Sequence, residues 1–182
     1  MKAALLIVDV QNDFCPGGAL PTPKGNIIVP VINELMEKFD LVLASRDWHP
    51  LDSVHFKRWP VHCVKGSFGA EFPLDLKKQN ITKIFEKGTR SKDDGYSAFE
   101  AKNINLAEYL KENEVDELYI TGLTAEYCVK STVLDAVKQG LKTFVIKDAV
   151  EGIRANEHDF DNALKDMKKA GATVITTDDI NV

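Results

Sequence analysis

Four residues with reactive side chains lie at or just past the ends of strand-like apolar runs: Asp9, Asp47, Lys87 and Cys128. In an open parallel sheet, the carboxyl ends of the strands gather along one edge, where such folds bind ligands. Carboxylates, an amine and a thiol would therefore meet in one crevice. This combination indicates covalent cysteine catalysis beside a metal.

The Cys128 thiol follows an apolar run and a turn, and it falls in the first turn of a predicted helix with Thr124 as its N-cap. The positive end of a helix dipole favours a thiolate, and the free backbone amides there could hold an oxyanion. Glu126 opposes the first effect by adding negative charge. The alternative is a small buried apolar residue, a role that free cysteine often has.

Asp9 and Lys87 have two interpretations each. An ionised carboxylate at the end of a buried strand is costly unless it is paired, so Asp9 either caps the following loop or acts as a general base with a raised pKa. Lys87 alone would be a solvated surface lysine. With Asp9 and Cys128 on the same edge, it is instead predicted to be their counter-charge.

A candidate metal site falls within residues 47–62, which contain Asp47, His49, His55 and His62. Asp47 and His49 are two residues apart, so an extended backbone directs both side chains to one side. His62 could complete a three-ligand set that leaves positions for water and substrate. One carboxylate with imidazoles suits Zn, Mn or Fe. The alternative is a loop in which the histidines pack against the nearby tryptophans.

Three aromatic residues could form the walls of a pocket for a flat ring, although each could also be part of the core or of a lid. These residues are Phe14, Trp59 and Tyr96.

Hydrophobic periodicity predicts strands that alternate with helices. The predicted strands are 3–8, 41–45, 81–86, 118–121, 142–146 and 173–176, and the predicted helices are 26–39, 105–113, 125–139 and 156–170. This order predicts an α/β fold, a three-layer α/β/α sandwich with a six-stranded, mostly parallel sheet of Rossmann-like form. Residues 48–80 show no clear period, and we expect a long ordered loop region with a functional role.

Composition narrows the class of protein. The 182 residues predict a single domain, 1–182. A net charge of −5 argues against nucleic acid or an anionic membrane as a partner, and no apolar run approaches the roughly 20 residues that span a bilayer. The three cysteines form a poor disulfide framework. With no export signal, we expect reduced thiols in the cytoplasm.

Five motifs occur in order along the chain: DVQNDFCPGG from Asp9, DWHP from Asp47, WPVHCV from Trp59, KGT from Lys87 with YSAF from Tyr96, and GLTAEYCV from Gly122. Together they resemble the nicotinamidases of the isochorismatase-like cysteine hydrolase superfamily, also known as pyrazinamidase-like enzymes. The resemblance runs from the first strand through at least Gly140 and implies the isochorismatase-like hydrolase fold.

The resemblance implies a catalytic triad of Asp9, Lys87 and Cys128. It also implies an oxyanion hole formed by the backbone amides of Thr124 and Cys128, shaped by a cis peptide bond between Leu123 and Thr124. Thr124 stands where alanine is common in the family, which leaves these amide roles possible because they belong to the backbone.

The metal would be held by Asp47, His49 and His62, with His55 as a fourth ligand or a supporting group. Many relatives place the second histidine four residues after the first, where this chain has Ser53. The resemblance also implies a pyridine pocket lined by Phe14, Trp59 and Tyr96.

The implied activity is metal-dependent hydrolysis of nicotinamide to nicotinic acid and ammonia through a cysteine thioester, in NAD salvage. Pyrazinamide would be a further substrate, and zinc the expected metal, with Mn or Fe as alternatives. Assembly into a homo-oligomer stays open. One alternative is a metal-free cysteine amidohydrolase of the same superfamily acting on another small amide. Another is a metal-binding or regulatory protein without catalysis.

Overall fold

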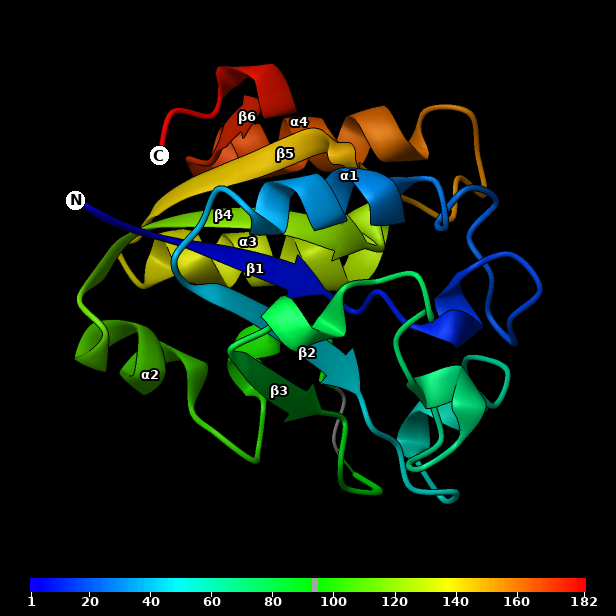
Figure 1. Cartoon of the computed structure of the whole chain (residues 1–182). Helices are drawn as coiled ribbons and strands as arrows, with labels where there is room; N and C mark the ends of the chain where they lie inside the picture. The colour runs from blue at the N-terminus through cyan, green and yellow to red at the C-terminus, as the bar shows by residue number, and fades with distance from the viewer. Residues whose placement is uncertain (93–94) are drawn as a thin grey trace.

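A computed structural model describes residues 1–92 and 95–182 and is built around one six-stranded sheet (Figure 1). All neighbouring strands are parallel, and their order is β3-β2-β1-β4-β5-β6. The strands are β1 (Lys2–Val8), β2 (Val42–Asp47), β3 (Lys83–Lys87), β4 (Val115–Leu123), β5 (Lys142–Glu151) and β6 (Thr173–Ile175). The predicted α/β fold with a six-stranded parallel sheet is confirmed.

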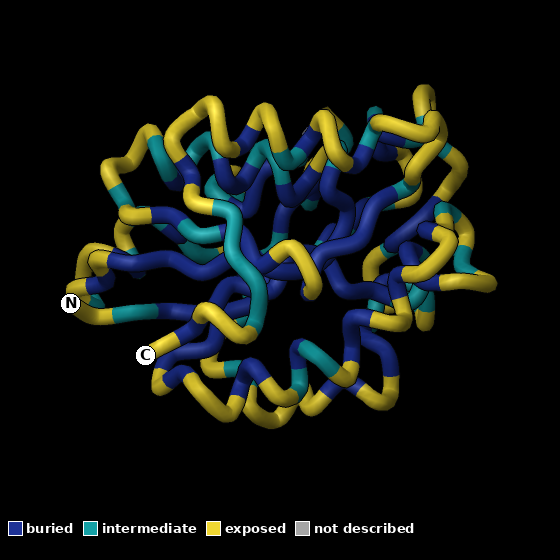
Figure 2. The backbone as a smooth tube through the Cα atoms, turned by 90° about the horizontal axis from the view of Figure 1, so that it is seen from above, coloured by how far each residue is buried: buried dark blue, intermediate teal, exposed yellow. Residues whose placement is uncertain are grey.

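Helices cover both faces of the sheet, which explains why the central strand β1 is a continuous apolar run. They are α1 (Ile28–Met36), α2 (Leu106–Glu112), α3 (Lys130–Lys138) and α4 (Asp159–Ala170). Leu6 of β1 packs in the core on the side of α2, α3 and α4. Its neighbours Leu5 and Ile7 point the other way, toward α1. Buried segments therefore occupy the middle of the molecule, between more exposed outer layers (Figure 2).

The ends of the helices follow the local sequence signals. The Asn105 side chain accepts a hydrogen bond from Glu108 N at the start of α2, as an N-cap residue does. Gly171 ends α4 with a φ of 117°, a conformation that favours glycine. These signals depend only on nearby residues, and the sequence predicted both ends correctly to within a few residues.

The largest differences from the prediction involve two strands, one helix and the loop region. β4 and β5 extend well beyond 118–121 and 142–146, because they pair with each other at Gly122–Val150 and Leu123–Glu151. The helix predicted over 125–139 begins with a π-helical turn, Ala125–Val129, and continues as α3. The region 48–80 contains three short 3₁₀ helices, Val54–Lys57, Phe68–Ala70 and Lys78–Asn80.

The strands all point toward one side of the molecule, where the loops that follow β1 and β2 lie (Figure 1). Both chain termini lie toward the opposite side. In the part of the chain that the structure describes, no helix has the length and apolar character needed to cross a membrane. The carboxyl ends of β1, β2, β3 and β4 lie together on the side where open parallel sheets bind ligands.

Candidate active site

A buried lysine is the centre of the site. Lys87 is the last residue of β3, and its Nζ lies 2.8 Å from Asp9 Oδ2. The same Nζ donates hydrogen bonds to Asp47 Oδ1 and, at 2.9 Å, to Gly95 O. It lies 3.4 Å from Cys128 Sγ. The structure thus brings together all four reactive residues that the sequence placed at the ends of strands.

Opposite charges keep this buried group ionised. Burial lowers the pKa of Lys87, but the Asp47 and Asp9 carboxylates outweigh it and raise that pKa well above the usual lysine value. Burial likewise raises the pKa of Asp47, but Lys87 and His49 overcome this effect and hold it far below its usual range. Lys87 and Asp47 therefore form an ion pair that is charged at neutral pH.

The Asp9 carboxyl is placed to exchange a proton with the Cys128 thiol. Burial raises the pKa of Asp9 despite the charge of Lys87, and the Ser45 hydroxyl donates to Asp9 Oδ1 at 2.8 Å. Burial also raises the pKa of the Cys128 thiol well above its usual value, although Lys87 lowers it in part. A carboxylate oxygen of Asp9 lies within 4.8 Å of Cys128 Sγ. The resting thiol is therefore protonated, and a neighbouring base is needed to activate it.

The turn before Cys128 has one of the backbone features that the resemblance implied. The peptide bond between Leu123 and Thr124 is cis. Thr124 occupies the predicted N-cap position, but its side chain makes no capping hydrogen bond among the described residues. Its carbonyl instead accepts bonds from Tyr127 N and Val129 N, both at 3.1 Å. The second bond spans five residues and defines a π-helical turn, a feature frequent at functional sites.

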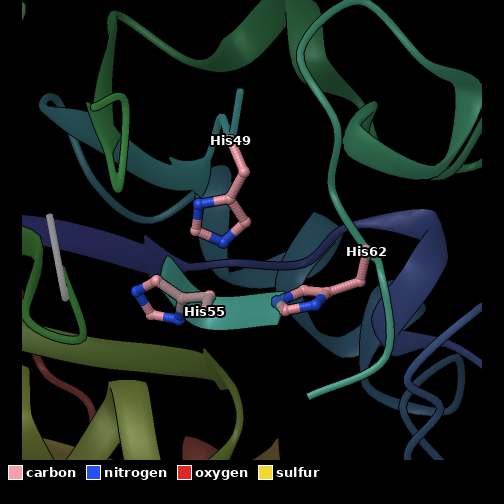
Figure 3. Close-up of side chains that lie close together, drawn as sticks. All are labelled: His49, His55 and His62. Carbon is pink, nitrogen blue, oxygen red and sulfur yellow. The ribbon is translucent and has the colours of Figure 1, made fainter. Parts of the chain in front are cut away.

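Three histidines and Asp47 form a second cluster beside the first. The rings of His49, His55 and His62 lie close together (Figure 3), with a nitrogen of each within 4.8 Å of the others. Asp47 Oδ2 lies 3.4 Å from His49 Nε2 and 3.9 Å from His62 Nε2. The predicted ligand set thus gathers in one place.

The structure places His55 inside this cluster. The Ser53 side chain accepts a hydrogen bond from His55 N at 3.2 Å and thereby caps the 3₁₀ helix Val54–Lys57. This cap explains how the chain tolerates a serine where many relatives have the second histidine, since His55 reaches the same centre from the first turn.

The cluster passes a chemical test for a metal site. His49 Nδ1 lies 2.8 Å from Gly88 O, and His62 Nδ1 lies 2.7 Å from Pro60 O. Carbonyl oxygens only accept hydrogen bonds, so each Nδ1 carries the proton and each Nε2 keeps a lone pair for a cation. His49 Nε2 is buried and has no hydrogen-bond partner among the described residues. Imidazoles with one carboxylate fit a divalent ion such as zinc.

The two histidines differ in electrostatic environment. Burial lowers the pKa of both, and it dominates for His62. For His49, the neighbouring Asp47 carboxylate outweighs burial and raises the pKa. Asp47 thus draws positive charge toward the cluster, and a bound cation would take the place of a proton there.

A pocket opens beside the Cys128 thiol and two of the histidines, His55 and His62. All three predicted aromatic residues line it, and Trp59 Nε1 donates to the Tyr96 hydroxyl at 3.0 Å. The complete lining is Phe14, Leu20, Asp47, His55, Trp59, His62, Tyr96, Thr124, Tyr127, Cys128 and Ile153. Its mostly apolar walls, with few polar groups, suit a small flat molecule.

Sequence reasoning missed several contributors to the site. Gln11 fixes Asp47 by donating to Asp47 O and Ala70 O at 2.8 Å and accepting from Asp47 N at 2.9 Å. A buried amide within the DVQN motif was the available signal. Tyr127 was signalled only by its position next to Cys128. Leu20 and Ile153 carried no signal, because tertiary packing alone brings them to the pocket.

Comparison with known proteins agrees with this arrangement. The isochorismatase domain family matches residues 3–179, nearly the whole chain. The chain belongs to the isochorismatase family.

Named relatives within the isochorismatase family match over their full length. The nicotinamidase of Escherichia coli (strain K12) is 39% identical, with 97% of this chain and 95% of the relative covered. The zinc complex of the pyrazinamidase of Pyrococcus horikoshii is 41% identical, with a TM-score of 0.88 over 97% of this chain and 99% of that one. The N-carbamoylsarcosine amidase of Thermoplasma acidophilum is 29% identical, with a TM-score of 0.83 and both chains covered completely.

Proposed function

We propose that this isochorismatase-family protein is a nicotinamidase, which hydrolyses nicotinamide to nicotinic acid and ammonia. Similarity to named nicotinamidases over nearly the whole chain identifies it as an amidohydrolase. One observation supports the narrower proposal best: Cys128, His55 and His62 line one and the same mostly apolar pocket. In a pyridine carboxamide, the amide carbon is the target of the nucleophile and the ring nitrogen is a donor to a metal ion.

The first half of the proposed reaction forms a thioester. Asp9 takes the thiol proton as Cys128 Sγ attacks the amide carbon, and the carbonyl oxygen becomes an oxyanion. The backbone amides of Thr124 and Cys128 stabilise this oxyanion; losing one such donor typically costs about 3–4 kcal/mol. The carbon–nitrogen bond then breaks, Asp9 returns its proton to the departing amine, and ammonia leaves.

The second half regenerates the thiol. Asp9 takes a proton from water, the water oxygen attacks the thioester carbon, and the carbon–sulfur bond breaks. Nicotinic acid is released, and Cys128 regains the proton. Lys87 stays charged throughout and lies 3.4 Å from Sγ, where it offsets the negative charge of the thiolate.

The proposed metal site consists of Asp47, His49, His55 and His62. We expect zinc, with Mn or Fe as alternatives. When bound, a divalent metal would act as a Lewis acid toward the pyridine nitrogen and so orient the ring. His49 and His62 hold their Nε2 atoms toward this site because their Nδ1 atoms are hydrogen-bonded to backbone carbonyls.

The proposal also covers the cellular role of the protein. Residues 1–182 would act as one hydrolase domain, in the cytoplasm and in NAD salvage, and pyrazinamide would be a further substrate because it keeps the carboxamide and a ring nitrogen.

The test is ammonia release from nicotinamide by the purified protein, measured before and after chelation and again after zinc, manganese or iron is added back. Activity that falls on chelation and returns with metal supports both the substrate and the metal. No activity with any of these metals would refute the nicotinamide assignment.

The second candidate is a metal-free amidohydrolase that acts on another small amide, such as a carbamoyl compound. The full-length likeness to an N-carbamoylsarcosine amidase favours it, whereas the open Nε2 of His49 argues against it. Elemental analysis of the purified protein and a panel of carbamoyl compounds distinguish the two candidates.

A further inference from the structure

The active-site pocket shares one wall with a second, more polar groove. Trp59, Tyr127 and Ile153 line both hollows. On the far side of this wall, the groove is lined by polar residues of α3 and α4 such as Lys130 and Asp159. Any displacement of the shared wall would therefore join the pocket to the groove and let larger molecules reach Cys128.

Ile153 lies on the loop between β5 and α4. It follows β5, which ends at Glu151, and it precedes α4, which begins at Asp159. Ile153 is only half-buried, and the next residue, Arg154, is exposed. Hydrophobic packing alone therefore gives this part of the wall little rigidity.

A carboxylate from the turn that carries Cys128 binds this loop. Glu126 Oε2 accepts a hydrogen bond from Ile153 N at 3.0 Å, and Glu126 Oε1 accepts one from Arg154 N at 2.9 Å. Arg154 has a φ of 53°, and two successive amides in such a turn form a concave site for an anion. Hydrogen bonds to a charged acceptor are stronger than neutral ones.

Glycine at position 152 allows the carboxylate to approach. A Cβ atom on Gly152 would lie 2.4 Å from Glu126 Oε1 and 2.6 Å from Glu126 Oε2. The approach is thus incompatible with any side chain there. Glu126 lies two residues before Cys128, so the turn that carries the nucleophile also binds the loop that contains Ile153.

We propose that Glu126 is a positioning residue that sets the size limit of the pocket by holding Ile153 in the wall shared with the groove. The molecule that fits within this limit is the small aromatic amide of the proposed function, and this identification of the ligand rests on that function. The carboxylate makes no chemical step; it determines which molecules reach the thiol.

Thiol alkylation measures this size limit without any turnover. Iodoacetamide and the bulkier N-phenyliodoacetamide are compared, with modification at Cys128 followed by peptide mass spectrometry. Both reagents reach this thiol through the pocket that Cys128 lines. In Glu126→Ala we expect the rate ratio of the small to the bulky reagent to fall about tenfold, the discrimination that a well-fitted apolar wall gives.

Two further variants test the two parts of the proposal, the Glu126 contact and the Ile153 wall. Gly152→Ala leaves Glu126 in place but displaces its carboxylate, so it should reproduce the lower ratio. Ile153→Ala removes the wall directly and should do the same. Arg154→Ala is the matched control: it removes the side-chain bonds to Glu151 at 2.9 and 2.7 Å but keeps the backbone amide that Glu126 binds. Its ratio should equal that of the wild type.

The outcomes separate this inference from the proposed function. A wild-type ratio in Gly152→Ala and Glu126→Ala, with a lower ratio in Ile153→Ala, overturns the role of Glu126. A wild-type ratio in Ile153→Ala overturns the shared wall. Nicotinamide hydrolysis by the same proteins is measured separately. If the wild type lacks it while the alkylation pattern holds, the substrate assignment fails and the size limit stands.

Discussion

The sheet has two edges where strands end, a carboxyl edge and an amino edge, and they differ in how far their ion pairs are exposed to water. At the carboxyl edge, the side chains of Lys87 and Asp9 are both 0% exposed and pair at 2.8 Å. At the amino edge, Lys142 pairs with Glu117 at a similar 2.7 Å, but its side chain is 55% exposed. The contact distances are alike, and the difference is solvent. Burying an ion pair carries a large desolvation cost. The buried pair at the carboxyl edge therefore indicates a role in function and not in stability.

Truncating the nucleophile tests that role and should have the largest effect. Cys128→Ala is expected to abolish hydrolysis while the protein still folds and binds metal, since the thiol contributes nothing to the histidine cluster. Steady-state ammonia release and elemental analysis measure the two properties. Cys15→Ala is the matched control, because Cys15 is also buried but does not line the pocket. Hydrolysis that persists in Cys128→Ala would refute the covalent route.

Removing the buried cation should have the next largest effect. Lys87→Met removes the cation that pairs with the buried Asp9 and Asp47 carboxylates, and breaking a buried pair in this way costs about 3–5 kcal/mol. Urea unfolding monitored by circular dichroism measures the loss. A cost below about 1 kcal/mol would mean that water solvates this edge and that the contrast between the edges is false.

Removing a ring from the histidine cluster should weaken metal binding. His49→Ala deletes a nitrogen whose only assigned role is to bind a cation, and even supporting groups around metal sites are worth about 10–100-fold in affinity. Titration of the metal-free protein with zinc, followed by calorimetry, checks the expectation. His158→Ala is the control, because His158 lies at the start of α4 and outside the cluster. Equal affinity in both variants would exclude His49 as a ligand.

The same substitution at the amino edge should change little. Lys142→Met removes a cation whose side chain is mostly in water, and exposed pairs contribute about 0–1 kcal/mol. Urea unfolding gives the loss of stability for both Lys142→Met and Lys87→Met. The two losses compare the same chemical change at an exposed and at a buried position. A loss at Lys142 as large as that at Lys87 would contradict the comparison.

A pH titration refines the description of the amino edge. Burial, and then the Glu117 carboxylate, raise the pKa of Tyr119 above its usual value of 10.0. Tyr119 is therefore harder to ionise in the folded protein, so its contribution to stability is complete below pH 10 and is lost as the pH rises further. Tyr119→Phe has no such group to ionise. Above pH 10, the melting temperature of the wild type should therefore fall relative to that of the variant. A pH-independent difference would show that Tyr119 titrates normally.

The sequence predicts the site best where the chemistry lies at the ends of strands. Asp9, Asp47 and Lys87 were placed correctly because apolar runs reveal buried strands and parallel strands share an edge. The place of His55 was less certain, because spacing alone does not show that Ser53 caps a 3₁₀ helix and turns the next imidazole inward.

The parts that sequence reasoning missed depend on long-range pairing. β5 continues past Ile146 through the charged residues Lys147 and Asp148, which end any apolar run. Only its pairing with β4 at Gly122 and Leu123 extends it. Ile153 reaches the pocket as a result of that extension, and Glu126 holds it through backbone amides. No local pattern in the sequence contains this information.

Asp47 belongs to both clusters at once, with Oδ1 toward Lys87 and Oδ2 toward His49 and His62. The Lys87 ammonium and a cation held by the histidines would therefore share one negative charge. By thermodynamic reciprocity, the factor by which such a cation changes the interaction of Asp47 with Lys87 equals the factor by which Lys87 changes the affinity for the cation. A cation on the histidine side would thus alter the electrostatic environment of the lysine beside the thiol.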